Sequence, residues 1–199
     1  MATIKEITVN FIESTGWKPR KTPEDPALRT EVIQEIQSWN AHDDCEAAEM
    51  LADTSCSIAE KMYGLMSYDY RRYGALYTAC CAYVDDTVAS NSVVLDAARK
   101  FGSRFARGEP LGLPALERLA ALLKEAHTLF TDAGANAIIT CTMDGMTAMA
   151  LEHTTTVIPH VTRWPEYLRS RVGVSMAYAH FGFARSWRET PESYIQLLP

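Results

Sequence analysis

The sequence predicts an all-α protein in which two helices are buried on most of their surface. Apolar residues recur at helical spacing along most of the chain. No segment alternates apolar and polar residues for long enough to indicate a strand. Two runs, 74–84 and 133–158, carry almost no charge, which is typical of interior helices. Together these observations favour a helical bundle around two central helices.

Residues 1–25 are expected to be an irregular N-terminal segment, and residues 26–199 a single helical domain. Several prolines block a continuous helix in the first segment. Asp25 before Pro26 is a typical helix start, with the aspartate as N-cap and the proline at the first helical position. The first helix is therefore expected to begin at Pro26 and to run through Trp39.

The remaining helices follow from their apolar stripes and their start and stop signals. Pro114 and Pro165 occupy first-turn positions, and Gly108 followed by a proline marks a stop. The last helix opens at 190–192 and reaches the end of the chain, which indicates a longer domain. The expected ranges after the first helix are about 43–66, 68–84, 92–108, 114–130, 133–158, 165–184 and 190–198.

Composition argues against several functional classes. With 199 residues, 47% of them hydrophobic and 22% charged, the chain can bury a continuous core. A net charge of -6 argues against broad attraction to nucleic acid or to an anionic membrane. No window approaches a membrane-spanning length of apolar residues, and the first residues lack the pattern of a signal peptide. We therefore expect a cytoplasmic protein with no nucleic-acid partner and no stable membrane insertion.

Cysteine and histidine do not form a recognisable catalytic or metal-binding pattern. The five histidines are isolated and make no HExxH motif, and no Ser lies in a GxSxG motif. The cysteines form no CxxC pair, so we interpret them as reduced packing residues. They are Cys45, Cys56, Cys80, Cys81 and Cys141.

Two adjacent aspartates, Asp85 and Asp86, follow directly after the apolar run 74–84. Mg²⁺ prefers oxygen ligands and commonly bridges one or two carboxylates to substrate phosphates. On a helix the two side chains would project about 100° apart, so one could face a cavity while the other supports it. The alternative is a solvated helix end, although acidic residues at a C-terminus oppose the helix dipole.

A pair of arginines supplies a candidate anion site. Arg169 and Arg171 follow Pro165, and Gly173 and other small or apolar residues come next. The planar guanidinium suits phosphate oxygens, and a glycine lets a ligand approach the backbone closely. The alternative is an ordinary pair of exposed arginines.

In their order and spacing, these features resemble the fungal trichodiene synthase family of class I sesquiterpene cyclases. The helix ending in Val84-Asp85-Asp86 is similar to the one that carries the DDxxD motif. The segment 140–152 is similar to a mid-chain helix with an interior break that contributes to the cavity wall. The segment 165–174 is similar to one in which Pro-x-aromatic-Leu-Arg opens a helix with a glycine four residues after the arginine.

The resemblance implies a class I terpene synthase-like helical bundle whose C-terminal helices are absent, and it assigns roles to individual residues. Asp85 and Asp86 fall on the metal-binding aspartates. Arg169 falls on the diphosphate-sensing arginine and Gly173 on the small effector residue at a helix break. Further contributions to substrate binding are expected from Tyr83, with Tyr77 as a second aromatic, and from Asp144.

The implied function is Mg²⁺-dependent ionisation and cyclisation of farnesyl diphosphate to a sesquiterpene, a carbon–oxygen lyase reaction. Ala89 replaces the last acid of DDxxD, and neither the second metal motif nor the family's C-terminal Arg-Tyr pair is present. The chain therefore resembles the N-terminal half, or slightly more, of a cyclase.

The alternative is a truncated, inactive cyclase-like protein that serves as a binding or assembly partner, or that arises from an incomplete gene model. For this alternative we expect the inner faces of 68–84 and 133–158 to be partly uncovered as a large exposed apolar patch, with association, including a homodimer, or poor solubility. A prenyl chain-elongating synthase is disfavoured, because it needs two DDxxD motifs and the chain has one reduced copy.

Overall fold

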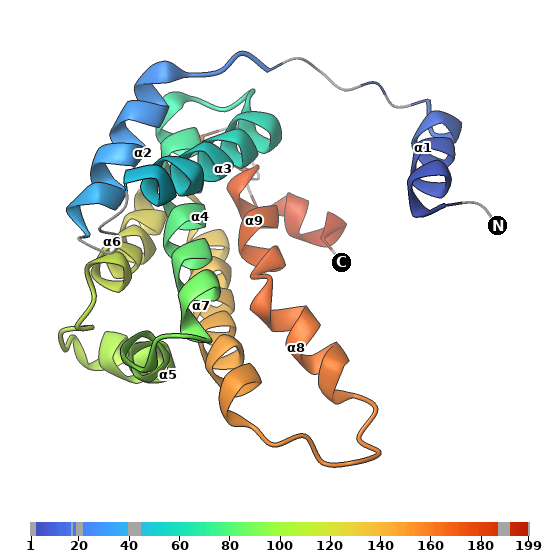
Figure 1. The fold of residues 1–199 in the computed structure, drawn as a ribbon. Helices are drawn as coiled ribbons and strands as arrows, with labels where there is room; N and C mark the ends of the chain where they lie inside the picture. The colour runs from blue at the N-terminus through green and yellow to red at the C-terminus, as the bar shows by residue number, and fades with distance from the viewer. Residues whose placement is uncertain (1–2, 17, 19–21, 40–44, 187–191, 199) are drawn as a thin grey trace.

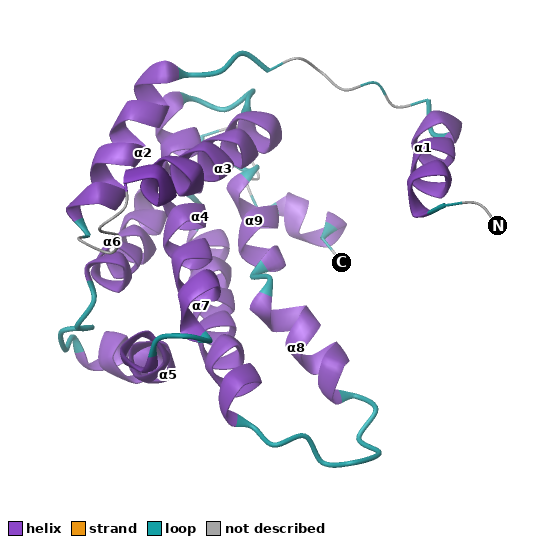
Figure 2. Cartoon of the chain, in the orientation of Figure 1, coloured by secondary structure: helices purple, strands orange, loops and turns teal. Residues whose placement is uncertain are grey.

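The computed structural model describes residues 3–16, 18, 22–39, 45–186 and 192–198. In these ranges it is all-helical, with α-helices, one 3₁₀ helix and no strand (Figure 2). This confirms the predicted fold class. The elements are α1 (Ile4–Ser14), α2 (Pro26–Ser38), α3 (Cys45–Tyr63), α4 (Tyr68–Val88), α5 (Ser92–Arg107), α6 (Pro114–Leu129), α7 (Asp132–Thr154), α8 (Trp164–Val172), α9 (Ser175–Phe181) and η1 (Ser193–Leu197).

Helix α1 was not expected, and it stands apart from the other helices in Figure 1. It forms because Thr3 and Glu6 make a capping box that satisfies two otherwise unpaired backbone N–H groups. None of its residues is buried, and Ile4 and Phe11 are exposed. The prediction of irregular structure is therefore wrong for Ile4–Ser14.

The bundle itself begins at α2 as predicted. The Asp25 carboxylate accepts hydrogen bonds from the backbone N–H groups of Ala27 and Leu28, and Pro26 occupies the first turn. The residues expected to open the next helix, Asp43 and Asp44, lie outside the described part of the chain. Helices α2 and α3 pack against each other and against α4.

Helix α4 is the central element, as its composition predicted. Every residue from Tyr73 to Cys81 is buried, and the helix contacts α2, α3, α5, α6, α7 and α9. An edge-to-face aromatic cluster joins α4 to α9, with Phe181 packed 5.2 Å from Tyr73 and 4.9 Å from Tyr77 between ring centroids. This contact fixes the position of α9 on the core.

Helix α7 is the second buried helix and runs without interruption from Asp132 to Thr154. The interior break implied for 140–152 is therefore wrong. No proline falls within α7, and Gly145 is accommodated because a neighbouring segment packs directly against it. Helices α8 and α9 both pack on α7, with α8 returning alongside it after the loop 155–163 (Figure 1).

The range 165–184, expected as one helix, is divided into α8 and α9. Helix α8 ends at Val172, Gly173 is its C-cap, and Val174 precedes α9 in a left-handed conformation with φ of 40°. The break therefore lies where the resemblance implied a helix break.

The chain end is anchored to this part of the bundle by one buried side chain. The Tyr194 hydroxyl lies 2.7 Å from Nδ1 of His180, and its ring stacks on Phe183 at 4.0 Å. The predicted opening of a helix at Thr190-Pro191 lies outside the described residues, and the segment that follows is the 3₁₀ helix η1. In the described ranges, no helix combines the length and the apolar character needed to cross a membrane.

Candidate active site

The paired aspartates lie on the last turn of α4, which continues past them to Val88. Both are exposed. Partial burial, followed by the neighbouring Asp86 and Glu152 carboxylates, raises the pKa of Asp85, and His153 opposes this effect. Asp85 therefore lies among carboxylates of the same charge, with His153 as the opposing group.

Glu152 and His153 are site residues that the sequence reasoning missed. They lie near the C-terminal end of α7, and their charges act on Asp85. The available signal was an isolated acid–histidine pair at the end of an otherwise nearly uncharged run. The sequence pair Glu152-His153 could be connected with Asp85 only through the packing of α4 on α7, which the structure shows.

The donor set fits a shared Mg²⁺ site better than a cage built from protein ligands alone. In the described ranges, no group of three or more His, Cys, Asp or Glu side chains is arranged to hold a metal ion. Asp85 and Asp86 offer adjacent carboxylates, and Mg²⁺ often takes one or two such ligands, with water and substrate phosphates completing the shell. The residues present therefore fit a metal that binds together with a phosphate-bearing ligand.

The two arginines of α8 have different environments. The Arg171 guanidinium lies 4.1 Å from the centroid of the Tyr167 ring, and its Nε is 3.6 Å from a carboxylate oxygen of Asp144. Tyr167 in turn stacks on Trp164 at 5.4 Å. Asp144, predicted to bind substrate, is thus engaged by Arg171.

Arg169 is the arginine that remains available to a ligand. It is exposed, and in the part of the chain that the structure describes its guanidinium has no hydrogen-bond or ion-pair partner. Gly173, at the end of the same helix, is also exposed, and a Cβ added there would meet no atom within 4 Å. Both predicted positions are therefore open to solvent.

Helix α7 contacts both α4, whose last turn carries the aspartate pair, and the arginine-bearing helix α8. Asp85 lies close enough to Glu152 to sense its charge, and Arg171 pairs with Asp144. Asp144 and Glu152 are about 12 Å apart along the α7 axis, at about 1.5 Å per residue. The end of α4 and the helix carrying Arg169 are therefore both placed against the C-terminal half of α7.

The predicted aromatic residues are placed away from this half of α7. Tyr83 is 7% exposed and packs edge-on to Trp39, the C-cap residue of α2, at 6.0 Å between centroids. Two residues along a helix turn the side chain by about 200°, so Tyr83 and Asp85 lie on nearly opposite faces of α4. Tyr77 is fully buried in the aromatic cluster. Neither position supports a direct contact with a ligand beside Asp85.

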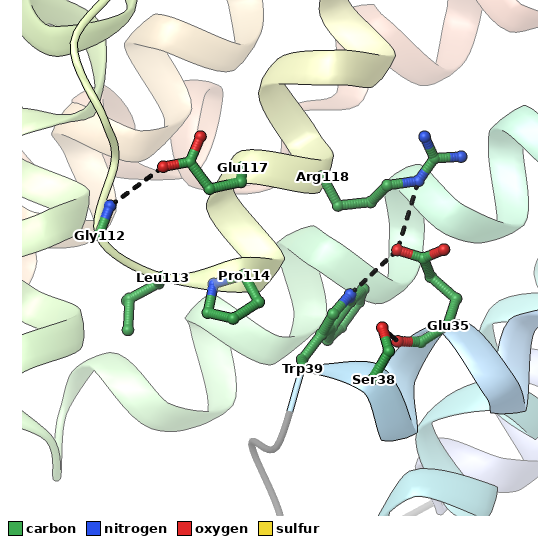
Figure 3. A pocket seen from close by; sticks show the side chains of 8 residues that line it. All are labelled: Glu35, Ser38, Trp39, Gly112, Leu113, Pro114, Glu117 and Arg118. Carbon is green, nitrogen blue, oxygen red and sulfur yellow. Dashed lines mark hydrogen bonds and ion pairs between the residues drawn. The ribbon is translucent and has the colours of Figure 1, made fainter.

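A cavity of about 480 Å³ lies on that other face, between α2 and the start of α6. Trp39, Glu35 and Arg118 contribute to its wall, and the Trp39 indole N–H donates to Glu35 (Figure 3). Because Trp39 contacts Tyr83 rather than the Asp85 face of α4, this cavity is separate from the candidate site.

Comparison with known proteins places this geometry in context. Over 188 residues, 91% of the chain, it is 29% identical to "Terpene synthase BipA" of Cochliobolus sativus. Over 147 residues, 71% of the chain, it is 29% identical to "Alpha-cuprenene synthase COP6" of Coprinopsis cinerea. No protein-family model matches.

These similarities support a relationship to fungal terpene synthases and do not single out trichodiene synthase. The matches cover 56% of BipA and 43% of COP6. The chain therefore spans about half the length of the curated relatives it matches.

Proposed function

We propose that this chain carries the diphosphate-ionising part of a sesquiterpene cyclase, with farnesyl diphosphate as substrate and Mg²⁺ as cofactor. The observation that supports the proposal is that Asp85, beside two further carboxylates, and Arg169, whose guanidinium has no partner among the described residues, both lie against the C-terminal half of α7. A metal-bound diphosphate is complementary to both. The similarity to proteins named as terpene synthases supports this class of reaction.

In the proposed reaction the allylic C–O bond breaks and its electron pair leaves with the diphosphate. Bound Mg²⁺ would supply Lewis-acid stabilisation of that leaving group. Asp85 would hold the metal, with Asp86 beside it, and Arg169 would donate hydrogen bonds from its planar guanidinium to phosphate oxygens. Gly173 would leave space for the ligand at the end of α8, since no atom lies within 4 Å of the position that a Cβ would take there.

The test is incubation of the purified chain with Mg²⁺ and farnesyl diphosphate, followed by gas chromatography of hydrocarbon and alcohol products. Arg169→Gln and Asp85→Asn should abolish any product. Arg99→Gln, which alters an exposed arginine on α5, is the matched control and should keep it. If a relative is active in parallel and this chain yields no product, the catalytic proposal fails for this chain.

The second candidate function is an inactive cyclase-like binding or assembly partner, and specific exposed residues favour it. The expected patch is wrong for Tyr73–Cys81, which are buried, and the exposed apolar side chains lie elsewhere: the loop 155–163 exposes Val157, Ile158 and Val161, and α3 exposes Met50 and Met62. Analytical ultracentrifugation distinguishes this candidate: it requires association, for example into a homodimer. A monodisperse monomer without product would count against both candidates.

A further inference from the structure

The break between α8 and α9 is seated in a niche on α7 that exists because residue 145 is glycine. A Cβ built on Gly145 would lie 2.4 Å from Cγ1 of Val174 and 3.3 Å from the carbonyl oxygen of Arg171. Carbon atoms in van der Waals contact are normally about 3.5–4.0 Å apart. Any larger residue at 145 would therefore push the break away from α7.

Val174 is held in a backbone conformation that its own side chain disfavours. Its φ of 40° lies in the left-handed region, where a β-branched residue is strained. The side chain is 2% exposed. The left-handed conformation therefore belongs to Val174, which packs against Gly145, and not to Gly173, whose φ of −72° is ordinary.

A second contact from the adjacent residue of α7 holds the same end of α8. Asp144 pairs with Arg171 at 3.6 Å, while Gly145 receives Val174. Arg169 lies on α8 between the loop 155–163 and this doubly held end. The direction in which α8 leaves the break, and with it the position of Arg169, is therefore set at Asp144 and Gly145.

We propose that Gly145 is a positioning residue that acts through Val174 to place Arg169 for a diphosphate ligand. The choice of diphosphate as ligand rests on the proposed function, whereas the effect of residue 145 on the position of α8 does not. A larger residue at 145 would displace α8 and move Arg169 without touching the ligand itself. Asp144 and Arg171 would assist by fixing the same end of α8.

The test compares four versions of the chain of residues 1–199. Gly145→Ala introduces the clash. Val174→Ala in the same chain removes Cγ1 and should relieve it, since the next-nearest atoms to the added Cβ are the Arg171 oxygen at 3.3 Å and Cβ of Val174 at 3.8 Å. Gly102→Ala is the matched control, because it also replaces a helical glycine but meets only Sδ of Met143 at 3.4 Å. The fourth protein is the unmodified chain.

Two measurements are made on each protein. Hydrogen exchange of the Trp164–Val172 amides, without ligand, reports whether α8 is displaced. Calorimetric titration with inorganic diphosphate and Mg²⁺ reports the placement of Arg169. For Gly145→Ala we expect faster exchange in α8 and about tenfold weaker diphosphate binding, the loss of roughly one charge-assisted hydrogen bond. The double variant should recover both properties, and Gly102→Ala should match the unmodified chain.

A final pair of variants separates positioning from general destabilisation. If Gly145 acts through Arg169, adding Gly145→Ala to Arg169→Gln should weaken diphosphate binding no further. A further loss, unchanged exchange in Gly145→Ala, or failure of Val174→Ala to rescue would each overturn the inference. Absence of diphosphate binding by the unmodified chain would instead overturn the proposed function. The exchange data alone would then decide whether residue 145 controls the position of α8.

Discussion

One buried hydrogen bond joins the two central helices, and its strength can be predicted from its geometry. The hydroxyl oxygens of Tyr77 on α4 and Thr142 on α7 are 2.7 Å apart, and both residues are fully buried. The Thr142 hydroxyl also donates to the carbonyl oxygen of Ile138 at 2.7 Å. Because that bond uses the only hydroxyl proton of Thr142, Tyr77 must be the donor between the two side chains.

This assignment predicts unequal costs for removing the two hydroxyl groups. Tyr77→Phe removes the donor and leaves Thr142 bonded to Ile138, so it should cost about 1 kcal/mol of unfolding free energy. Thr142→Val leaves a buried O–H donor without an oxygen partner, and should cost about 1–3 kcal/mol. The Cys81 sulfur near that hydroxyl is a weak substitute acceptor. The double variant should cost less than the sum, because it leaves no unpaired donor.

Urea unfolding of the four proteins, followed by far-ultraviolet circular dichroism, measures these free energies. The double-mutant cycle should return a coupling of about 1–2 kcal/mol. Strictly additive costs would refute the assignment of Tyr77 as donor to Thr142. A larger cost for Tyr77→Phe than for Thr142→Val would refute it as well.

Two further predictions concern the helix ends near the candidate site. The pKa of Asp85 is raised in the folded state, so between its unfolded pKa of about 4 and its higher folded pKa the folded chain binds more protons than the unfolded chain. The free energy of unfolding therefore falls as pH rises through this interval. Asp85→Asn should flatten this part of a urea-midpoint profile and stabilise the chain at neutral pH, and an unchanged profile would contradict the crowding of carboxylates. The Asn91 side chain caps α5 by accepting from the N–H groups of Val93 and Val94, so Asn91→Ala should cost about 1 kcal/mol in thermal unfolding. Asn91→Asp should retain the cap, and equal losses in both variants would count against it.

The sequence predicted the elements whose signals are local. Asp25-Pro26 marks the start of α2, and the unbroken apolar run identifies α4 as a buried helix. Helix α1 also had a local signal, the Thr3–Glu6 capping box, but the prolines that follow it concealed a short helix. The sequence predicts the end of α4 at Val84, although the helix continues through Thr87 to Val88.

What could not be predicted depends on contacts between helices. Periodicity across 165–184 is continuous and does not predict the break, which only the resemblance placed at Gly173; the close packing of Val174 against Gly145 is visible only in the structure. Nothing in the local sequence distinguishes Arg169 from Arg171. The distinction arises because Asp144, on another helix, and Tyr167 engage only Arg171. The proximity of Glu152 to Asp85 likewise requires the packing of α4 on α7.

The niche at Gly145 also constrains how this fold can change during evolution. A mutation that adds a side chain at 145 is tolerated only after the residue at 174 has become smaller, because the two share one space. That order leaves a cavity first, whereas a change at 145 before the change at 174 passes through the clash. Substitutions at these two positions are therefore expected to be correlated among homologous sequences, with the change at 174 preceding the change at 145.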